Sequence, residues 1–389
     1  MEIINLKNGS ERKIRTGYLW AFNNELVEVK HLTPGTVVEL FNYNNSKSFG
    51  KCFYNPNSLI TVRLLKTSGE INTNFFIERI RKAKNHRDFL LPNQSNYRLV
   101  FGESDLLSGL IIDKYENNFS LQIHSIGMEL NRDMIVEALL NIYPETEFII
   151  MRANSKMREI EGLSLEDEIL FGKDPGKILT NDSNIKLEIS LTESQKTGYF
   201  LDQRFHRYEI GRIAKGKRVL DCYTNQGGFA LHSKAGGASE VTAIDSSQEA
   251  LNFAERNAEI NSLDINFVRD DVKFFLENAA VNKQRWDIII LDPPAFSKTK
   301  KAVGAAKNAY IAINTLGIRL LKPGGMLATA SCSQHLREDT FMEIIQNSAR
   351  KAGRNLTQIY RGFQPPDHPV HISMPETSYL KFFIFKIDY

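Results

Sequence analysis

One short stretch of this sequence constrains the fold more than any other. The aliphatic residues 288–291 are followed at once by Asp292, Pro293 and Pro294. Such a run is typical of a parallel strand that is buried on both faces. The prolines have a fixed φ and no N–H donor, so they end the strand. Because ligands bind outside the carboxyl ends of parallel strands, we expect Asp292 to lie at the mouth of a site.

Further strands of this kind are predicted throughout the carboxyl-terminal half of the sequence. Strands are predicted at residues 218–221, 240–245, 265–269, 286–292, 325–330, 358–363 and 379–387, with helical stretches between them. Strands that alternate with helices are typical of βαβ units. We therefore predict an α/β fold over residues 182–389, with a Rossmann-like, doubly wound and mostly parallel sheet of seven strands.

The amino-terminal half has a different pattern. Residues 1–72 show short strand signals at 27–29, 37–41, 49–54 and 59–65, separated by Pro, Gly and Asn, which predicts a small β-barrel. Residues 73–181 predict a compact α+β domain. It would begin with a helix over 74–91, whose apolar stripe includes Phe89, and continue with strands at 97–101, 110–113, 119–124 and 147–151 and a helix over 129–142.

Composition excludes several classes of protein. A length of 389 residues with 42% hydrophobic and 24% charged residues is ordinary for a globular chain of two or three domains. The three cysteines, Cys52, Cys222 and Cys332, are widely spaced, which argues against a disulfide framework and against a CxxC-type metal site. The first twenty residues are charged, and no apolar run approaches membrane-spanning length, so we expect a cytosolic protein that does not contact membranes.

The excess of positive over negative charge lies near the amino terminus. Residues 1–90 carry 14 Lys and Arg against 8 Asp and Glu. Cations bind phosphates and aromatic rings stack on bases, so an RNA-binding surface is predicted where the two interleave. It would be formed by Arg12, Lys13, Arg15 and Trp20. In the alternative interpretation, Trp20 and Phe22 only close the barrel.

Acidic residues follow successive predicted strands. Asp221 ends the first strand and leads to Gly227 and Gly228, which let the backbone approach a ligand closely. Asp245 and Asp271 follow the next two strands. Each acid alone could be a helix cap, and Ser246 with Glu249 would form a capping box after Asp245. The recurrence of acids at four strand ends, with Asp292, predicts a site for S-adenosylmethionine.

This prediction also places a loop over the methionine end of the cofactor at residues 195–204, unless that loop only joins two domains. The full set of predicted cofactor-binding residues comprises Phe200, Gln203, Asp221, Tyr223, Thr224, Gln226, Gly227, Gly228, Asp245, Ser246, Asp271, Val272 and Asp292.

Cys332 follows the fifth predicted strand, flanked by Ser331 and Ser333. Carbon 5 of cytosine is a poor nucleophile, and a thiolate that adds to carbon 6 makes carbon 5 able to accept a methyl group. A free thiol has a pKa near 8.5, so such a site must lower that pKa. Asp292 could hold a proton on the ring nitrogen. A lone cysteine is often only an apolar filler, but its place at a strand end beside Asp292 favours a nucleophile.

With these motifs the sequence resembles the bacterial 23S rRNA 5-methylcytosine methyltransferases, over nearly the whole chain. The matching stretches are 18–22, 34–35, 53–56, 101–109, 111–113, 196–204, 221–229, 292–298, 310–314, 331–333 and 367–370. The resemblance implies a PUA-like domain, a central domain and a class I methyltransferase domain. It further implies Cys332 as the nucleophile, Asp245, Asp271 and Asp292 in the cofactor and base pockets, large-subunit ribosomal RNA as the partner, and a homodimer.

The sequence departs from related enzymes at one point. Many RNA cytosine methyltransferases have a cysteine after the motif IV proline, whereas Pro294 and Ala295 occupy that place here. The group that removes the carbon 5 proton is therefore not assigned. Two alternatives stay open: methylation of a guanine or adenine nitrogen, with which Phe296 is compatible, and a non-catalytic RNA-binding factor of ribosome assembly.

Overall fold

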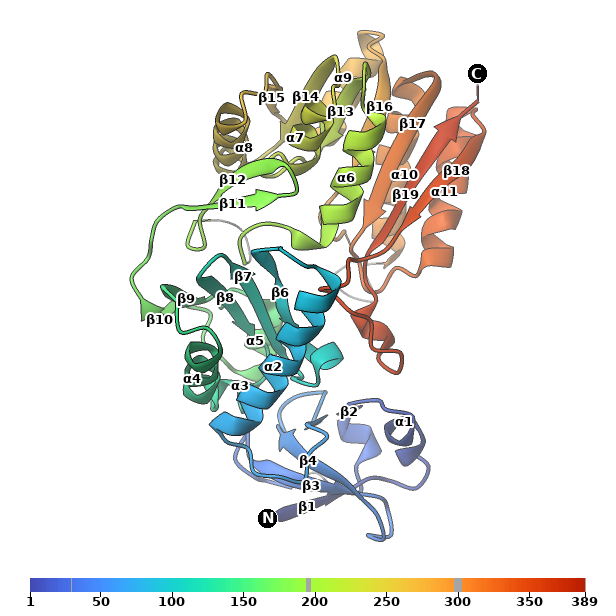
Figure 1. Cartoon of the computed structure of the whole chain (residues 1–389). Coiled ribbons are helices and arrows are strands. Elements are labelled where there is room, and N and C mark those ends of the chain that lie inside the picture. The colour runs from blue at the N-terminus through green and yellow to red at the C-terminus, as the bar shows by residue number, and fades with distance from the viewer. Residues whose placement is uncertain (29, 194–196, 297–302, 389) are drawn as a thin grey trace. The chain divides into compact units, whose positions relative to one another are not determined.

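The computed structural model describes residues 1–28, 30–193, 197–296 and 303–388. Two compact units, each built from three segments of chain, make up the protein (Figure 1). The first unit comprises Met1–Ile178, Ser190–Leu201 and Pro366–Thr377. The second comprises Leu179–Ile189, Asp202–Pro365 and Ser378–Tyr389.

The first unit begins with a small five-stranded sheet in the order β1-β3-β4-β5-β2. Its strands are β1 (Glu2–Asn5), β2 (Trp20–Ala21), β3 (Val37–Phe41), β4 (Ser48–Tyr54) and β5 (Val62–Leu64), and a short helix α1 (Glu11–Arg15) precedes β2. The strand predicted at 27–29 is not formed at Val27, which lies in a bend, and residue 29 lies outside the described residues. Apolar side chains of this sheet, such as Val38 and Leu64, form its core together with Ile14 of α1.

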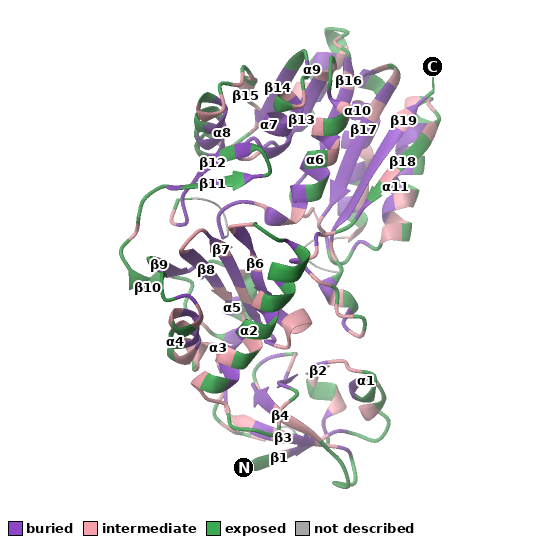
Figure 2. Ribbon diagram, viewed as in Figure 1, coloured by how far each residue is buried: buried purple, intermediate pink, exposed green. Residues whose placement is uncertain are grey.

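The rest of the first unit is an α+β arrangement around a second sheet, in the order β10-β9-β8-β7-β6. The strands are β6 (Asn96–Phe101), β7 (Leu110–Tyr115), β8 (Asn118–Ile123), β9 (Phe148–Met151) and β10 (Glu168–Gly172). The helices are α2 (Thr73–Leu90), η2 (Gly102–Asp105), α3 (Ile126–Glu129), α4 (Arg132–Ile142) and α5 (Lys156–Glu161). Figure 2 shows β6 to β9 largely buried, whereas β10 at the edge of the sheet and the outer faces of α2 and α4 are exposed.

Helix α2 corrects one prediction. The side chain of Asn72 accepts a hydrogen bond from the Phe75 amide and so caps the helix. Its buried face recurs at helical spacing through Phe76 and Ile80 to Arg87. Phe89 is therefore 81% exposed and not part of the apolar stripe, because two residues correspond to about 200° of rotation around the helix.

The second unit contains the predicted α/β sheet, in the order β15-β14-β13-β16-β17-β19-β18. Its strands are β13 (Arg218–Cys222), β14 (Glu240–Asp245), β15 (Asn266–Arg269), β16 (Trp286–Leu291), β17 (Leu321–Ser331), β18 (Leu356–Gly362) and β19 (Lys381–Ile387). The five strands from β15 to β17 pair in parallel, and β19 is antiparallel to both β17 and β18. The predicted seven-stranded, mostly parallel sheet is thus confirmed.

Helices connect these strands: α6 (Arg204–Ile213), α7 (Gly228–Ala235), α8 (Gln248–Ile260), α9 (Val272–Val281), α10 (Val303–Leu320) and α11 (Glu338–Ala352). A hairpin of β11 (Ile178–Asp182) and β12 (Ile185–Ile189) precedes α6. The central strands are buried between the helices (Figure 2), and their aliphatic residues, among them Ile288, Ile289 and Leu327, form the core. In the part of the chain that the structure describes, no helix is long and apolar enough to cross a membrane.

Candidate active site

The loop between β13 and α7 wraps around the carboxylate of Asp221. One oxygen of this buried carboxylate accepts hydrogen bonds from the Thr224 hydroxyl (2.6 Å) and the Ala230 amide (3.0 Å). The other oxygen, Oδ1, is buried and has no hydrogen-bond partner among the described residues. Burial raises the pKa of Asp221 to about 7, and the negative charge of Asp245 adds to this effect. The loop therefore offers a buried carboxyl oxygen to a ligand.

Gly227 lets the loop turn tightly into helix α7. Its φ is +82°, a conformation that residues with a Cβ rarely adopt. A Cβ at this position would also lie 3.1 Å from the Cβ of Ala254, and Gly227 and Gly228 begin helix α7 without side chains. The predicted loop residues Tyr223, Thr224 and Gln226 lie in the same turn.

Asp245 joins the next strand to this loop. At the end of β14, its Oδ2 accepts a hydrogen bond from the Asn225 amide (2.9 Å), and its Oδ1 accepts one from the Ser247 amide (3.0 Å). The predicted capping box at Ser246 is wrong. Ser247 caps α8 through the Ala250 amide (3.2 Å), because the Asp245 carboxylate orders one further residue before the helix starts. Ser246 is exposed beside Asp245.

The third acid, Asp271, is the N-cap of α9. Its carboxylate accepts a hydrogen bond from the Phe274 amide (3.0 Å), while Asp271 itself is exposed. Val272 packs into the core beneath it. The helix-cap interpretation, which the sequence left open for every strand-end acid, therefore applies to Asp271, and one oxygen of its carboxylate remains available at the strand end.

Asp292 lies immediately after β16, as predicted. Its Oδ2 accepts a hydrogen bond from the Gln203 side-chain amide (2.9 Å). Removal from water raises the pKa of Asp292 to about 7, and the negative charges of Asp202 and Asp221 add to the shift. Asp292 is thus protonated in a large fraction of molecules near neutral pH. A carboxyl group in this state can donate a proton as well as accept one.

Gln203 reaches Asp292 from the start of α6, in the segment predicted to cover the cofactor. Its other amide atom, Oε1, lies 2.5 Å from Nδ1 of the buried His206. Phe200 belongs to the first unit, and residues 195 and 196 of the predicted loop lie outside the described residues. Residues 297 and 298 of the Asp-Pro-Pro motif also lie outside them.

Cys332 emerges from the strand next to Asp292. Strand β17 is parallel to β16, with Leu291 opposite Thr329, so the chain reaches Cys332 at the same sheet edge as Asp292. Cys332 is partly exposed, while Ser331 and Ser333 on either side of it are buried. By contrast, Cys222 lies within β13 in the core, where burial raises its pKa well above the ordinary value.

An aromatic chain connects the Cys332 turn to the cofactor loop. The Tyr310 hydroxyl is 3.0 Å from the Ser331 hydroxyl and 3.4 Å from that of Ser333. The ring of Phe296, from the Asp-Pro-Pro motif, packs against Tyr310 (4.7 Å between centroids) and Tyr223 (6.5 Å). Sequence reasoning did not assign Tyr310 to the site. Residues 310–314 are among the stretches that carry the family resemblance, so the signal was present in the sequence, but helical spacing alone indicates only a core residue at Tyr310.

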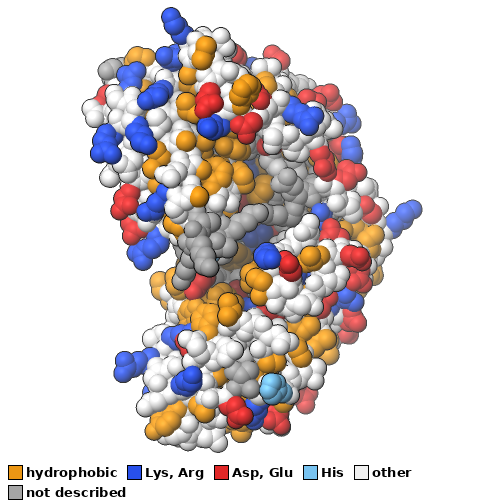
Figure 3. Space-filling model, turned by 180° about the vertical axis from the view of Figure 1, so that it is seen from behind, with side chains coloured by type: hydrophobic (Ala, Val, Ile, Leu, Met, Phe, Trp, Pro, Cys, Tyr) orange, Lys and Arg blue, Asp and Glu red, His pale blue; other side chains and the backbone are white. Residues whose placement is uncertain are grey.

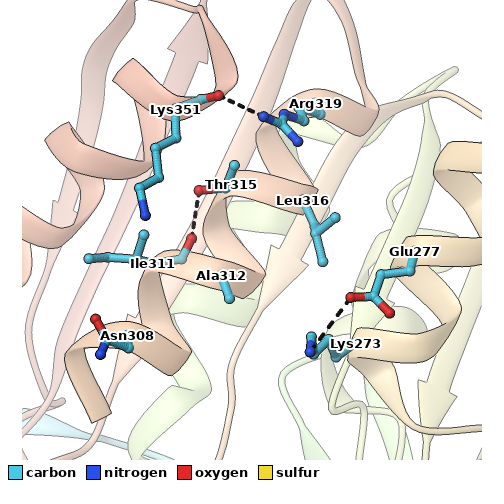
Figure 4. A pocket seen from close by; sticks show the side chains of 9 residues that line it. All are labelled: Lys273, Glu277, Asn308, Ile311, Ala312, Thr315, Leu316, Arg319 and Lys351. Atoms are coloured by element: carbon cyan, nitrogen blue, oxygen red, sulfur yellow. Dashed lines mark hydrogen bonds and ion pairs between the residues drawn. The ribbon is translucent and has the colours of Figure 1, made fainter. Parts of the chain in front are cut away.

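Two further residue sets lie elsewhere. In the first unit, the Asp105 carboxylate accepts two hydrogen bonds from the Arg87 guanidinium, and the Asp367 carboxylate accepts one from the Arg98 amide, so both acids have structural partners. A surface hollow of about 470 Å³ lies between α9, α10 and α11 (Figure 4). Its lining comprises Lys273, Glu277, Asn308, Ile311, Ala312, Thr315, Leu316, Arg319 and Lys351, and so includes none of the strand-end acids.

The predicted RNA-binding residues differ in their availability. Arg12 and Arg15 are exposed on α1. The Lys13 ammonium binds Glu25 (2.6 Å) and lies over the ring of Phe22 (4.4 Å).

Trp20 has structural contacts instead. Its Nε1 donates hydrogen bonds to the carboxylate of Glu103 (3.1 Å) and the hydroxyl of Ser108 (3.2 Å). These contacts favour the structural interpretation for Trp20. On the face shown in Figure 3, several Lys and Arg side chains gather at the upper left, and elsewhere they are interspersed with Asp and Glu.

The strand-end arrangement fits S-adenosylmethionine. The buried Oδ1 of Asp221, which has no hydrogen-bond partner among the described residues, suits a cationic or hydrogen-bonding group. Asp245 lies one strand away, where a ribose diol is bound in related sheets. Asp292 follows β16, which pairs with β13 on the side opposite to β14. The strand order is that of an open α/β sheet with its switch point beside β13.

Comparisons with known proteins agree with this geometry. Residues 168–386 match the family model of S-adenosylmethionine-dependent methyltransferases, and residues 4–67 match that of the PUA-like domain. The chain is 36% identical to "Ribosomal RNA large subunit methyltransferase I" of Escherichia coli and 34% identical to that of Yersinia pseudotuberculosis, with 98% of both chains covered in each case.

Solved structures show the same fold. An S-adenosylmethionine-dependent methyltransferase from Streptococcus mutans superimposes with a TM-score of 0.85 at 22% identity, over 99% of this chain and 100% of that chain. A second methyltransferase structure, in complex with SAH, gives a TM-score of 0.87 with the same identity and coverage. This chain therefore belongs to the family of S-adenosylmethionine-dependent large-subunit ribosomal RNA methyltransferases.

Proposed function

We propose that this enzyme methylates carbon 5 of a cytosine in 23S ribosomal RNA through a covalent bond between Cys332 and carbon 6. The observation that carries the proposal is the convergence of two strand ends. Cys332 leaves β17 and Asp292 leaves the parallel neighbour β16 at one sheet edge, and Phe296 and Tyr310 connect both to the cofactor loop. Methylation of a base nitrogen would need no thiol at this position, because a lone pair attacks directly.

The two residues have complementary tasks in this reaction. The Cys332 thiolate forms a bond to carbon 6, which makes carbon 5 electron-rich. Asp292 gives a proton to the ring nitrogen as negative charge develops there, since its raised pKa leaves a large fraction of the carboxyl groups protonated near neutral pH. When bound, S-adenosylmethionine supplies a methyl group on a sulfonium. The proton of carbon 5 then passes to a base or to solvent, the sulfur–carbon 6 bond breaks, the ring nitrogen returns its proton to Asp292, and the thiolate is restored.

The proposed cofactor contacts follow the strand ends. The ribose would be held by Asp245 and Ser246, and the base end would be lined by Asp271, Val272 and Asp292. The methionine part would be held by the remaining predicted residues: Phe200, Gln203, Asp221, Tyr223, Thr224, Gln226, Gly227 and Gly228. The predicted division into a PUA-like RNA-binding part (1–72), a central part (73–181) and a methyltransferase part (182–389) belongs to the same proposal. So do a cytoplasmic location, a homodimer, and RNA contacts by Arg12, Lys13, Arg15 and Trp20.

The test compares two Cys→Ala variants on ribosomal RNA from cells that lack the gene. Cys332→Ala should abolish the formation of 5-methylcytidine, measured by mass spectrometry of the nucleosides. Cys52→Ala, a buried cysteine of the amino-terminal sheet, is the matched control and should keep activity. RNA that contains 5-fluorocytosine should trap Cys332 in a stable adduct, because fluorine cannot leave carbon 5 as a proton does.

Each contrary result identifies another function. Full methyl transfer by Cys332→Ala, with the product on a guanine or adenine nitrogen, would refute the carbon 5 chemistry. Failure of the wild-type protein to bind S-adenosylmethionine in a titration would favour an RNA-binding assembly factor. Loss of one 5-methylcytidine in the gene deletion, restored by the wild type but not by Cys332→Ala, is the result that the proposal requires.

A further inference from the structure

Lys381 lies beside the Cys332 turn although it is 49 positions away in the sequence. It is the first residue of β19, and the antiparallel pairing places it opposite Ser331, the residue that precedes Cys332. Its side chain is buried, with 7% of the residue exposed. A lysine is rarely buried to this extent unless its charge is paired. The partners of its ammonium group therefore need an explanation.

Two backbone carbonyl oxygens bind the ammonium group. Nζ of Lys381 donates a hydrogen bond to the carbonyl of Ser333 (2.7 Å) and another to the carbonyl of Tyr379 (2.7 Å). Because an ammonium group has three N–H donors, one donor is left over. The bond to Ser333 also ties β19 to the residue that follows Cys332. Lys381 thus contacts the chain on both sides of the cysteine.

No carboxylate forms an ion pair with Lys381 among the residues that the structure describes. The negative charge of Glu338, at the start of α11, raises the pKa of Lys381 without an ion pair between the two side chains. The Glu338 carboxylate is paired with Arg361 instead (2.9 Å). A buried cation without a counter-ion is unfavourable, since the carbonyl dipoles replace only part of its hydration. A site of this kind favours a neighbouring group that can become negative.

Cys332 is that neighbour. Burial lowers the pKa of Lys381 to about 8, and the charge of Cys332 is the first of the interactions that oppose this shift, followed by that of Glu338. Near neutral pH Lys381 is therefore mainly the ammonium ion. The Tyr310 hydroxyl faces the same turn from α10, and the charges of both Cys332 and Asp292 act on it.

We propose that Lys381 is a positioning residue that holds the sulfur of Cys332 in the thiolate form, as its counter-ion, and fixes the turn around it through the Ser333 carbonyl. The thiol proton passes to solvent, and the ammonium remains charged throughout. This role rests on the proposed function, because only a covalent mechanism needs the thiolate. The positive charge of Lys381 would stabilise the thiolate of Cys332, which a free cysteine does not form to a large extent at neutral pH.

The test measures the reactivity of Cys332 without RNA and without cofactor. The protein is treated with iodoacetamide between pH 6 and pH 9.5, and alkylation of the peptide that contains Cys332 is followed by mass spectrometry. In the wild type, half-maximal reactivity should occur below the value of about 8.5 that is typical of a free thiol. A midpoint at or above that value would overturn the proposal without any variant.

Three variants separate charge from structure. Lys381→Met keeps the apolar stem and removes the charge, and it should slow alkylation at pH 7 about tenfold, as expected for a change of one pKa unit. Lys381→Arg keeps the charge and should stay within about threefold of the wild type. Lys386→Met is the matched control at the other end of β19, opposite Met326, and should react like the wild type.

Two outcomes refute the role. Equal alkylation rates for Lys381→Met and the wild type would show that the charge does not act on the sulfur. Equal losses in Lys381→Met and Lys381→Arg would show a structural effect only. If Lys381→Met does not fold, the arginine variant and the wild-type pH profile still decide. The methylation assay of Cys332→Ala tests the covalent mechanism, whereas the alkylation assay tests only the effect of Lys381 on the thiol. Failure of one proposal can therefore be distinguished from failure of the other.

Discussion

Asp292→Asn should make the protein more stable while it inactivates the enzyme. Asp292 is held in a site where its pKa is about 7, roughly three units above its ordinary value of 3.8. The ionised form is therefore disfavoured in the folded state. Asparagine has the same shape without the charge, and its side-chain carbonyl can still accept the hydrogen bond from Gln203.

The free energy that Asp292 costs the folded state follows from the rise in its pKa and depends on pH. Below pH 4 the carboxyl group is protonated in both the folded and the unfolded states, so it costs nothing. Between pH 4 and pH 7 only the unfolded state releases the proton, and the cost to the folded state grows by about 1.4 kcal/mol for each pH unit. Above pH 7 the cost reaches its full value, at most about 4 kcal/mol. Asp292→Asn removes this cost.

Urea unfolding at pH 4.5 and at pH 8 measures the effect. The variant should exceed the wild type by under about 1 kcal/mol at pH 4.5 and by about 2–4 kcal/mol at pH 8. Asp264→Asn, at an exposed acid of the same unit, is the control and should change little at either pH. Methyl transfer by Asp292→Asn should fall by a factor of about 10²–10⁴. A variant that is less stable than the wild type at pH 8, or a difference that does not grow with pH, would refute the reasoning.

Three further variants test other parts of the molecule. Asp105→Ala should cost about 3–5 kcal/mol in urea unfolding, because it removes the counter-ion of the buried Arg87 guanidinium and its hydrogen bonds of 2.6 and 2.7 Å to Asp105. Gly227→Ala should cost about 1–3 kcal/mol, since its φ is +82°, and should weaken S-adenosylmethionine binding in calorimetry. Arg12→Ala with Arg15→Ala should weaken RNA binding and flatten its salt dependence, with unchanged thermal unfolding.

Many strands of both units were predictable because their sequences are strongly marked. The strands at 37–41 and 240–245 were predicted to the residue, since turn residues bound their apolar runs. Short-range patterns failed where competing local contacts decided the outcome. Ser247 rather than Ser246 caps α8 because Asp245 holds the intervening turn, and Phe89 is exposed because Arg87 occupies the buried face of α2.

The candidate site was only partly predictable. The acids after β13, β14 and β16 could be found because parallel strands bring their carboxyl ends to one edge. Lys381 could not be found in this way, because its position depends on the antiparallel insertion of β19 between β17 and β18. Sequence spacing carries no information about such a long-range pairing.

The division of each compact unit among three chain segments has a consequence for the way the protein can be taken apart. Residues 190–201 and 366–377 belong to the first unit, yet the second unit occupies the chain between and around them. Asp367 from the last of these segments binds the amide of Arg98. A single cut anywhere between residues 202 and 365 therefore removes a piece of both units. Neither compact unit can be expressed as one continuous stretch of the sequence. A fusion protein that uses one unit must therefore also include its two other chain segments.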